Sequence, residues 1–194
     1  MSVTANIRWH DANQAYLVHE IALLRSVLER GASATVDDGV IEPDNDSPES
    51  STSEINPPPA IEQLCTAFGL SHFERAILLL CAGVELDSSF ARAVAAAQSE
   101  SRQGLPTFGL ALAALPEPHW SALAPAGALR RWRLVDLATG DTLTSARIRI
   151  DERVLHYLAG VSHLDERLAG MLESVAPDGE LPPSQLDQAY QAAH

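Results

Sequence analysis

Apolar residues cover nearly the whole circumference of one predicted helix, which lies between Ser71 and Asp87. Ser71 can cap the start of this helix, and Glu74, three residues later, supplies the second half of a capping box. A helix that is apolar on all sides belongs in the middle of a domain, so we expect the rest of the chain to cover it. Its apolar residues are Phe73, Ile77, Leu78, Leu79, Leu80, Cys81 and Val84.

A second amphipathic pattern predicts a helix from Asp11 to Arg30, with Asp11 as its N-cap and Gly31 as its stop. The apolar residues of this helix form a seam at helical spacing. Two interpretations stay open: the helix docks on the domain or on its own copy, or it detaches and its seam binds a partner protein. The seam residues are Leu17, Ile21, Leu24 and Leu28.

The segment from Ala32 to Pro59 has the composition of a linker. Seven acidic residues and no basic residue lie between Val36 and Glu54, and three prolines end the segment. Such a stretch buries too little apolar surface to offset the entropy of ordering it. The predicted organisation is an amphipathic helix at 1–31, an acidic disordered linker at 32–59, a helical domain at 60–175 and a linker-like tail at 176–194.

The predicted domain begins with helices and changes to an alternating pattern after Pro125. We predict helices at 60–69, 71–87, 89–101, 108–115 and 119–123, then strands at 132–137 and 143–150 around a turn at Gly140. Helices at 152–159 and 164–175 follow. This order predicts a mainly α fold, a helical domain with a winged-helix-like two-stranded β-hairpin.

Charge and composition narrow the possible partners and the compartment. The chain has 13 basic residues, all of them arginine, and 26 acidic residues, which give a net charge of −13. This charge disfavours nonspecific attraction to nucleic acid and to anionic membranes. The start of the chain lacks the pattern of a signal peptide, and Cys65 and Cys81 are interpreted as buried thiols on apolar helix faces. We therefore expect a cytoplasmic protein with no membrane partner.

Several strings, in this order, carry a family resemblance: FGLSHFERAILLLCAGVELDSSFA, LPTFGLALAAL, HWSAL, LRRWRLVDL and RIDERVLHYLAG. They resemble the N-terminal region of AAA+ ATPases associated with bacterial contractile injection systems, over about residues 60–172. The resemblance implies a winged-helix-like domain that precedes an ATPase module in the same polypeptide. It also implies that this domain engages a partner protein of the injection system, or a substrate protein, for the hexameric motor.

The chain itself is not predicted to be an enzyme. A phosphate-binding P-loop needs a lysine, and this sequence has none, so ATP and Mg²⁺ are expected only in a separate ATPase module and no cofactor is expected here. We expect either that the sequence ends before that module or that it is a stand-alone relative. The seven histidines show no metal-ligand spacing, and no nucleophile motif is present, so no catalytic or metal-binding residue is predicted.

A cluster of arginines surrounds the predicted hairpin. Arg131 and Arg133 are expected on one face of the first strand, and Arg147 and Arg149 on one face of the second. The cluster predicts a partner-binding surface, for which a protein or an acidic segment is the leading candidate. A DNA-binding winged-helix regulator is the alternative. Against it, the helix that precedes the hairpin, taken as Phe108 to Leu115, offers no polar side chain to a base.

Two further expectations concern assembly and the aromatic residues. An oligomerisation module, built on the first helix, is the third candidate function, so a homo-oligomer is a possible assembly. Trp120 and Trp132 are expected to be core anchors, and Trp9 is expected to be the exposed aromatic residue.

Overall fold

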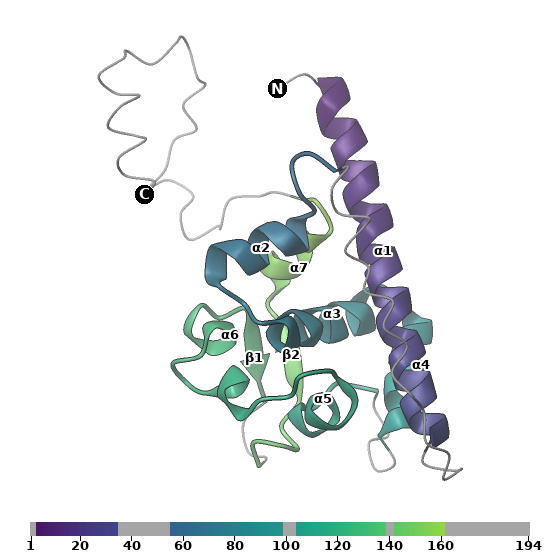
Figure 1. The fold of residues 1–194 in the computed structure, drawn as a ribbon, viewed down its shortest axis with the longest axis vertical. Coiled ribbons are helices and arrows are strands. Elements are labelled where there is room, and N and C mark those ends of the chain that lie inside the picture. The colour runs from purple at the N-terminus through teal and green to yellow at the C-terminus, as the bar shows by residue number, and fades with distance from the viewer. Residues whose placement is uncertain (1–2, 35–54, 99–103, 139–141, 162–194) are drawn as a thin grey trace. The chain divides into compact units, whose positions relative to one another are not determined.

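The computed structural model describes residues 3–34, 55–98, 104–138 and 142–161 (Figure 1). The predicted turn at Gly140, most of the acidic linker, the helix predicted at 164–175 and the tail lie outside these residues. None of the helices in the described ranges is long and apolar enough to cross a membrane.

The first helix, α1 (Val3–Ala34), packs against α3 and α4 and belongs to the body of the domain (Figure 1). It begins before Asp11 and continues past Gly31, so neither predicted boundary is correct. The four seam residues are at most 7% exposed. Of the two interpretations of this helix, docking on the domain agrees with the structure, and the expectation that the seam is a surface for a partner protein is corrected, because its residues are part of the core. They are Leu17, Ile21, Leu24 and Leu28.

Polar contacts also fix α1 to the domain. Asn13, which is 2% exposed, accepts a hydrogen bond from the backbone N–H of Ala60 at 2.7 Å and donates one to the carbonyl of Leu158 at 2.9 Å. It thereby satisfies a free donor at the start of one helix and a free acceptor at the end of another. Trp9 is half-buried and donates to the carbonyl of Pro57 at 2.8 Å, so the expectation of an exposed Trp9 was wrong.

Helices α2 (Ala60–Phe68) and α3 (His72–Leu86) confirm the predicted pattern. Gly69 ends α2 in a left-handed conformation, with φ 62°. Ser71 and Glu74 form the complete capping box at the start of α3. The apolar residues of α3 from Phe73 to Ala82 are buried on all sides, which confirms that this helix is the centre of the domain; towards its end Val84 is half-buried and Leu86 is exposed.

A partly buried ionic cluster joins α1, α2 and α3. The guanidinium of Arg75 donates to Glu20 at 2.9 Å, to Glu62 at 2.7 Å and to the hydroxyl of Tyr16 at 3.1 Å. Burial lowers the pKa of Arg75, but the charge of Glu20 and the hydrogen bond to Glu62 raise it by more, so the guanidinium stays charged. The Arg75 cluster therefore holds three helices together through one cation.

Helix α4 (Ser88–Ala97) begins at Asp87, which accepts a hydrogen bond from the backbone N–H of Ser89. It ends four residues before the predicted end at Ser101. The ring of Phe90 lies directly over Gly83 of α3, where an added Cβ would approach the ring to 2.9 Å. The lack of a side chain at Gly83 is what lets these two helices meet closely.

The second half of the domain is built around a small antiparallel hairpin. Helix α5 (Phe108–Ala114) begins at Thr107, the predicted cap, and the 3₁₀ helix η1 (Trp120–Leu123) and the single turn α6 (Ala128–Arg131) follow. Strands β1 (Val135–Leu137) and β2 (Ile148–Ile150) pair with Val135 opposite Ile150. Thr107 forms a further antiparallel bridge with Arg147, on the other side of β2.

Helix α7 (Glu152–Leu158) follows β2 and is capped by Asp151, as predicted. Both strands are shorter than expected, but the mainly helical fold with a two-stranded hairpin is confirmed. The alternation predicted for the second strand holds, because Ala146, Ile148 and Ile150 are all buried.

Candidate functional site

The four arginines predicted to share the hairpin lie in two separate places. Arg131 is in the last turn of α6, and Arg133 lies in the turn that precedes β1. Arg149 is on β2, and Arg147 immediately precedes that strand. A strand was expected over Trp132 to Leu137, but β1 contains only the last three of these residues. Arg131 and Arg133 are therefore not on a strand. The predicted arginine-rich hairpin is corrected accordingly.

The outward face of the hairpin mixes both signs of charge. Asp136 lies directly opposite Arg149 in the strand register, and both side chains are exposed. Glu85 of α3 is 3.7 Å from the same arginine. Arg147 is exposed and has no side-chain partner in the described ranges. The hairpin therefore presents two arginines beside two carboxylates, and not a concentrated positive field.

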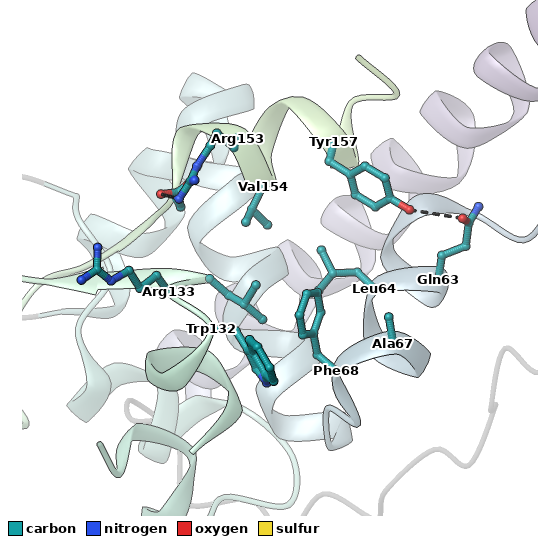
Figure 2. A pocket seen from close by; sticks show the side chains of 11 residues that line it. Gln63, Leu64, Ala67, Phe68, Trp132, Arg133, Arg153, Val154 and Tyr157 are labelled. Atoms are coloured by element: carbon teal, nitrogen blue, oxygen red, sulfur yellow. Dashed lines mark hydrogen bonds and ion pairs between the residues drawn. The ribbon is translucent and has the colours of Figure 1, made fainter. Parts of the chain in front are cut away.

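A groove of about 330 Å³ opens between α2, α7 and the turn before β1 (Figure 2). Its base is apolar, and two aromatic groups rise on either side of it. Phe68 packs against Trp132 with ring centroids 5.5 Å apart, and the hydroxyl of Tyr157 donates to Gln63 at 3.2 Å. The apolar lining includes Leu64, Ala67, Leu134 and Val154.

Arginines lie at the hairpin end of this groove (Figure 2). The guanidinium of Arg153 donates two hydrogen bonds, of 2.9 and 3.0 Å, to the carboxylate of Asp151. This contact lowers the pKa of the Asp151 carboxyl. Arg131 lies over the ring of Trp132, 5.1 Å from its centroid. Arg133 lines the groove, is exposed, and has no carboxylate partner in the described ranges. The acidic group that lines the groove is thus already bound, whereas Arg133 is available to a ligand.

The turn that positions Trp132 and Arg133 is a Schellman motif. The backbone N–H of Leu134 bonds to the carbonyl of Leu129 at 2.9 Å, and that of Arg133 to the carbonyl of Arg130 at 3.1 Å. The motif places its left-handed residue at Arg133, with φ 52°. Glycine is the usual residue there, because a side chain strains this conformation. The chain therefore keeps an arginine at a position that favours glycine.

Replacing Arg133 by glycine is expected to raise the free energy of unfolding by about 0.5–1 kcal/mol. Glycine relieves the strain of the left-handed conformation, which stabilises the folded state. Part of this gain is offset because glycine loses more conformational entropy on folding than arginine does. Urea denaturation followed by circular dichroism measures the change. Arg131→Gly is the matched control and is expected to be destabilising, since Arg131 is helical. Loss of stability in Arg133→Gly would contradict the strain argument.

The cysteines and histidines show no reactive arrangement in the described part of the chain. Burial raises the pKa of Cys65 to about 12, and it also raises the pKa of the fully buried Cys81. His119 bonds to the hydroxyls of Ser71 and Ser121 at 2.8 and 2.9 Å. Among the described residues, no group of histidine, cysteine and acidic side chains could hold a metal ion.

The hairpin, the strand-like bridge at Thr107 and the preceding short helices agree with a comparison against protein families. The model for "Winged helix domain, variant" matches residues 6–172. The chain belongs to this family. Searches of curated proteins and of solved structures found no significant match. The family match begins within α1, so this winged-helix domain includes the helix that we predicted to be separate, and the boundary expected at residue 31 falls inside α1.

The order of elements in the structure shows which helix precedes the hairpin. It is α6, a single turn, and not the α5 segment that we took as Phe108 to Leu115. This correction matters because a DNA-reading winged helix places the helix before its hairpin in the major groove. The sequence pattern hid α6, since four residues carry too little periodicity to predict a helix.

The groove is the feature that sequence reasoning missed. Trp132 was expected in the core but is 51% exposed, and Trp120 is 61% exposed, packing edge-on against Phe108. A tryptophan among three arginines, in the string RRWR, was the available signal for Trp132, because a core position rarely has charged neighbours on both sides.

Proposed function

We propose that this winged-helix domain is a non-catalytic module that binds protein and does not read DNA. The observation that carries the proposal is the helix before the hairpin. Four residues of α helix span only about 6 Å, too little to present a row of side chains to base edges. Arg130 donates to the carbonyl of Leu123, and Trp132 packs on Phe68. Arg130 of α6 and part of the Trp132 ring that follows this helix are therefore used for contacts within the domain.

Electrostatics support the same proposal. A protein that holds DNA neutralises several phosphates with lysine or arginine, whereas this chain carries a net charge of −13 and pairs Arg149 with the carboxylate of Glu85. The third candidate, an oligomerisation module built on the first helix, loses its basis because the seam of α1 is buried within the domain.

The family resemblance in the sequence supports a finer proposal. We propose that the domain is the N-terminal part of a cytoplasmic AAA+ ATPase of a contractile injection system, and that it engages a partner or substrate protein for the motor. In this proposal ATP and Mg²⁺ bind only in the ATPase module of the same polypeptide. Sequencing the gene tests it: a reading frame that continues into a P-loop module supports the proposal, and a stop codon after the codon for His194 contradicts it.

No DNA binding is expected in a direct test of the chain. The measurement is the fluorescence anisotropy of a labelled 20-base-pair duplex at about 50 mM NaCl, with protein up to roughly 100 μM, which covers ordinary nonspecific affinity. The expected result is no rise in anisotropy. Binding that falls steeply with salt, and is abolished by Arg131→Glu and Arg147→Glu, would instead establish the DNA-binding alternative.

A further inference from the structure

We propose that the groove between α2 and α7 binds a short acidic peptide segment through one large apolar anchor residue. This inference rests on the proposed function and deepens it, since it names the site and the kind of protein segment that occupies it. Three observations carry it: the shape of the groove, its aromatic walls and the unpaired arginine at its end (Figure 2).

The volume of the groove limits the size of the ligand. About 330 Å³ lies at the low end of the range for ligand pockets, which suits one aromatic or branched side chain with its neighbours. Trp132 and Tyr157 flank this space, and tryptophan, tyrosine and arginine are the residues that most often dominate binding energy at protein interfaces. Because half of the Trp132 surface is exposed, a ligand that covers it removes a large apolar area from water.

The charged side chains at the groove favour a negatively charged ligand. Arg133 has no carboxylate partner in the described ranges, and Arg131 is held beside it on the ring of Trp132. The groove's own acid, Asp151, is occupied by Arg153. A peptide with a carboxylate next to its anchor therefore meets the unpaired Arg133, while the groove lining offers a basic peptide no free carboxylate.

The backbone at Arg133 supports this assignment. Its left-handed conformation is strained for an arginine, and strain of this kind is often kept where function needs the residue. The Schellman turn places Trp132 and Arg133 side by side at the groove, so one turn supplies both the apolar anchor contact and the cation.

The test uses the full chain and a fluorescein-labelled decapeptide of glutamate and aspartate, with leucine and phenylalanine at its two central positions. Anisotropy is expected to show saturable binding that weakens several-fold between 50 and 300 mM NaCl. Trp132→Ala, Arg133→Glu and Ala67→Trp, which fills the groove from an exposed position on α2, are each expected to weaken binding at least tenfold. The matched controls Trp120→Ala and Arg147→Glu lie outside the groove lining and are expected to leave binding unchanged.

Several results would overturn the proposal. They are no binding at 1 mM protein, equal binding of a peptide with serine at both central positions, and equal losses in the groove and control variants. A dimer in light scattering that Ala67→Trp dissolves, together with no peptide binding, would show that a second copy occupies the groove. The two proposals fail in different ways. No peptide binding together with no duplex binding would remove the peptide site alone, whereas duplex binding would contradict the proposed function.

Discussion

Arg75→Met is expected to lower the free energy of unfolding by about 3 kcal/mol. The substitution leaves the carboxylates of Glu20 and Glu62 without their shared cation, and the Glu20 side chain is only 9% exposed. Breaking a buried ion pair by removing one partner costs more than the pair contributes, because the remaining charge stays out of water. The lower end of the usual range applies, since the Arg75 side chain is 20% exposed. Urea denaturation followed at 222 nm measures the loss.

Two controls separate this effect from the loss of any arginine. Arg92→Met removes an exposed arginine of α4 and is expected to change stability by less than about 0.5 kcal/mol. Adding Glu20→Gln and Glu62→Gln to Arg75→Met is expected to restore part of the loss, since neutral amides leave no unpaired charge. A loss below about 1 kcal/mol in Arg75→Met itself would show that water already reaches the carboxylates.

Local signals in the sequence predicted three helix starts correctly, although Asp11 was wrongly predicted to cap α1. The caps at Ser71, Thr107 and Asp151 were each placed correctly, because a cap depends on a side chain and a backbone group only two or three residues apart. Gly31 was wrongly predicted to stop α1. A glycine in a helix costs only about 1 kcal/mol, and the packing of α1 on α3 and α4 outweighs that local preference.

The groove could not be predicted from local sequence patterns. The string RRWRLVDL alternates like a strand, but a Schellman turn occupies its first half, and its usual marker, glycine, is replaced by Arg133. The exposure of Trp132 is set by Phe68, which lies far away in the sequence, so no window around Trp132 could reveal it. A site that joins α2, α7 and one turn is a tertiary feature.

The packing of α1 against the domain predicts a second large loss of stability. Leu28 of this helix is 1% exposed and lies in the core cluster. Leu28→Ala is expected to lower the free energy of unfolding by about 3 kcal/mol, through lost apolar burial and the cavity left behind. Leu23→Ala is the matched control on the same helix; Leu23 is 41% exposed, so its loss is expected to stay below about 1 kcal/mol. Urea denaturation of both variants gives the comparison. Equal, small losses would mean that α1 leaves the domain easily, and the seam would regain the partner-binding role predicted from the sequence.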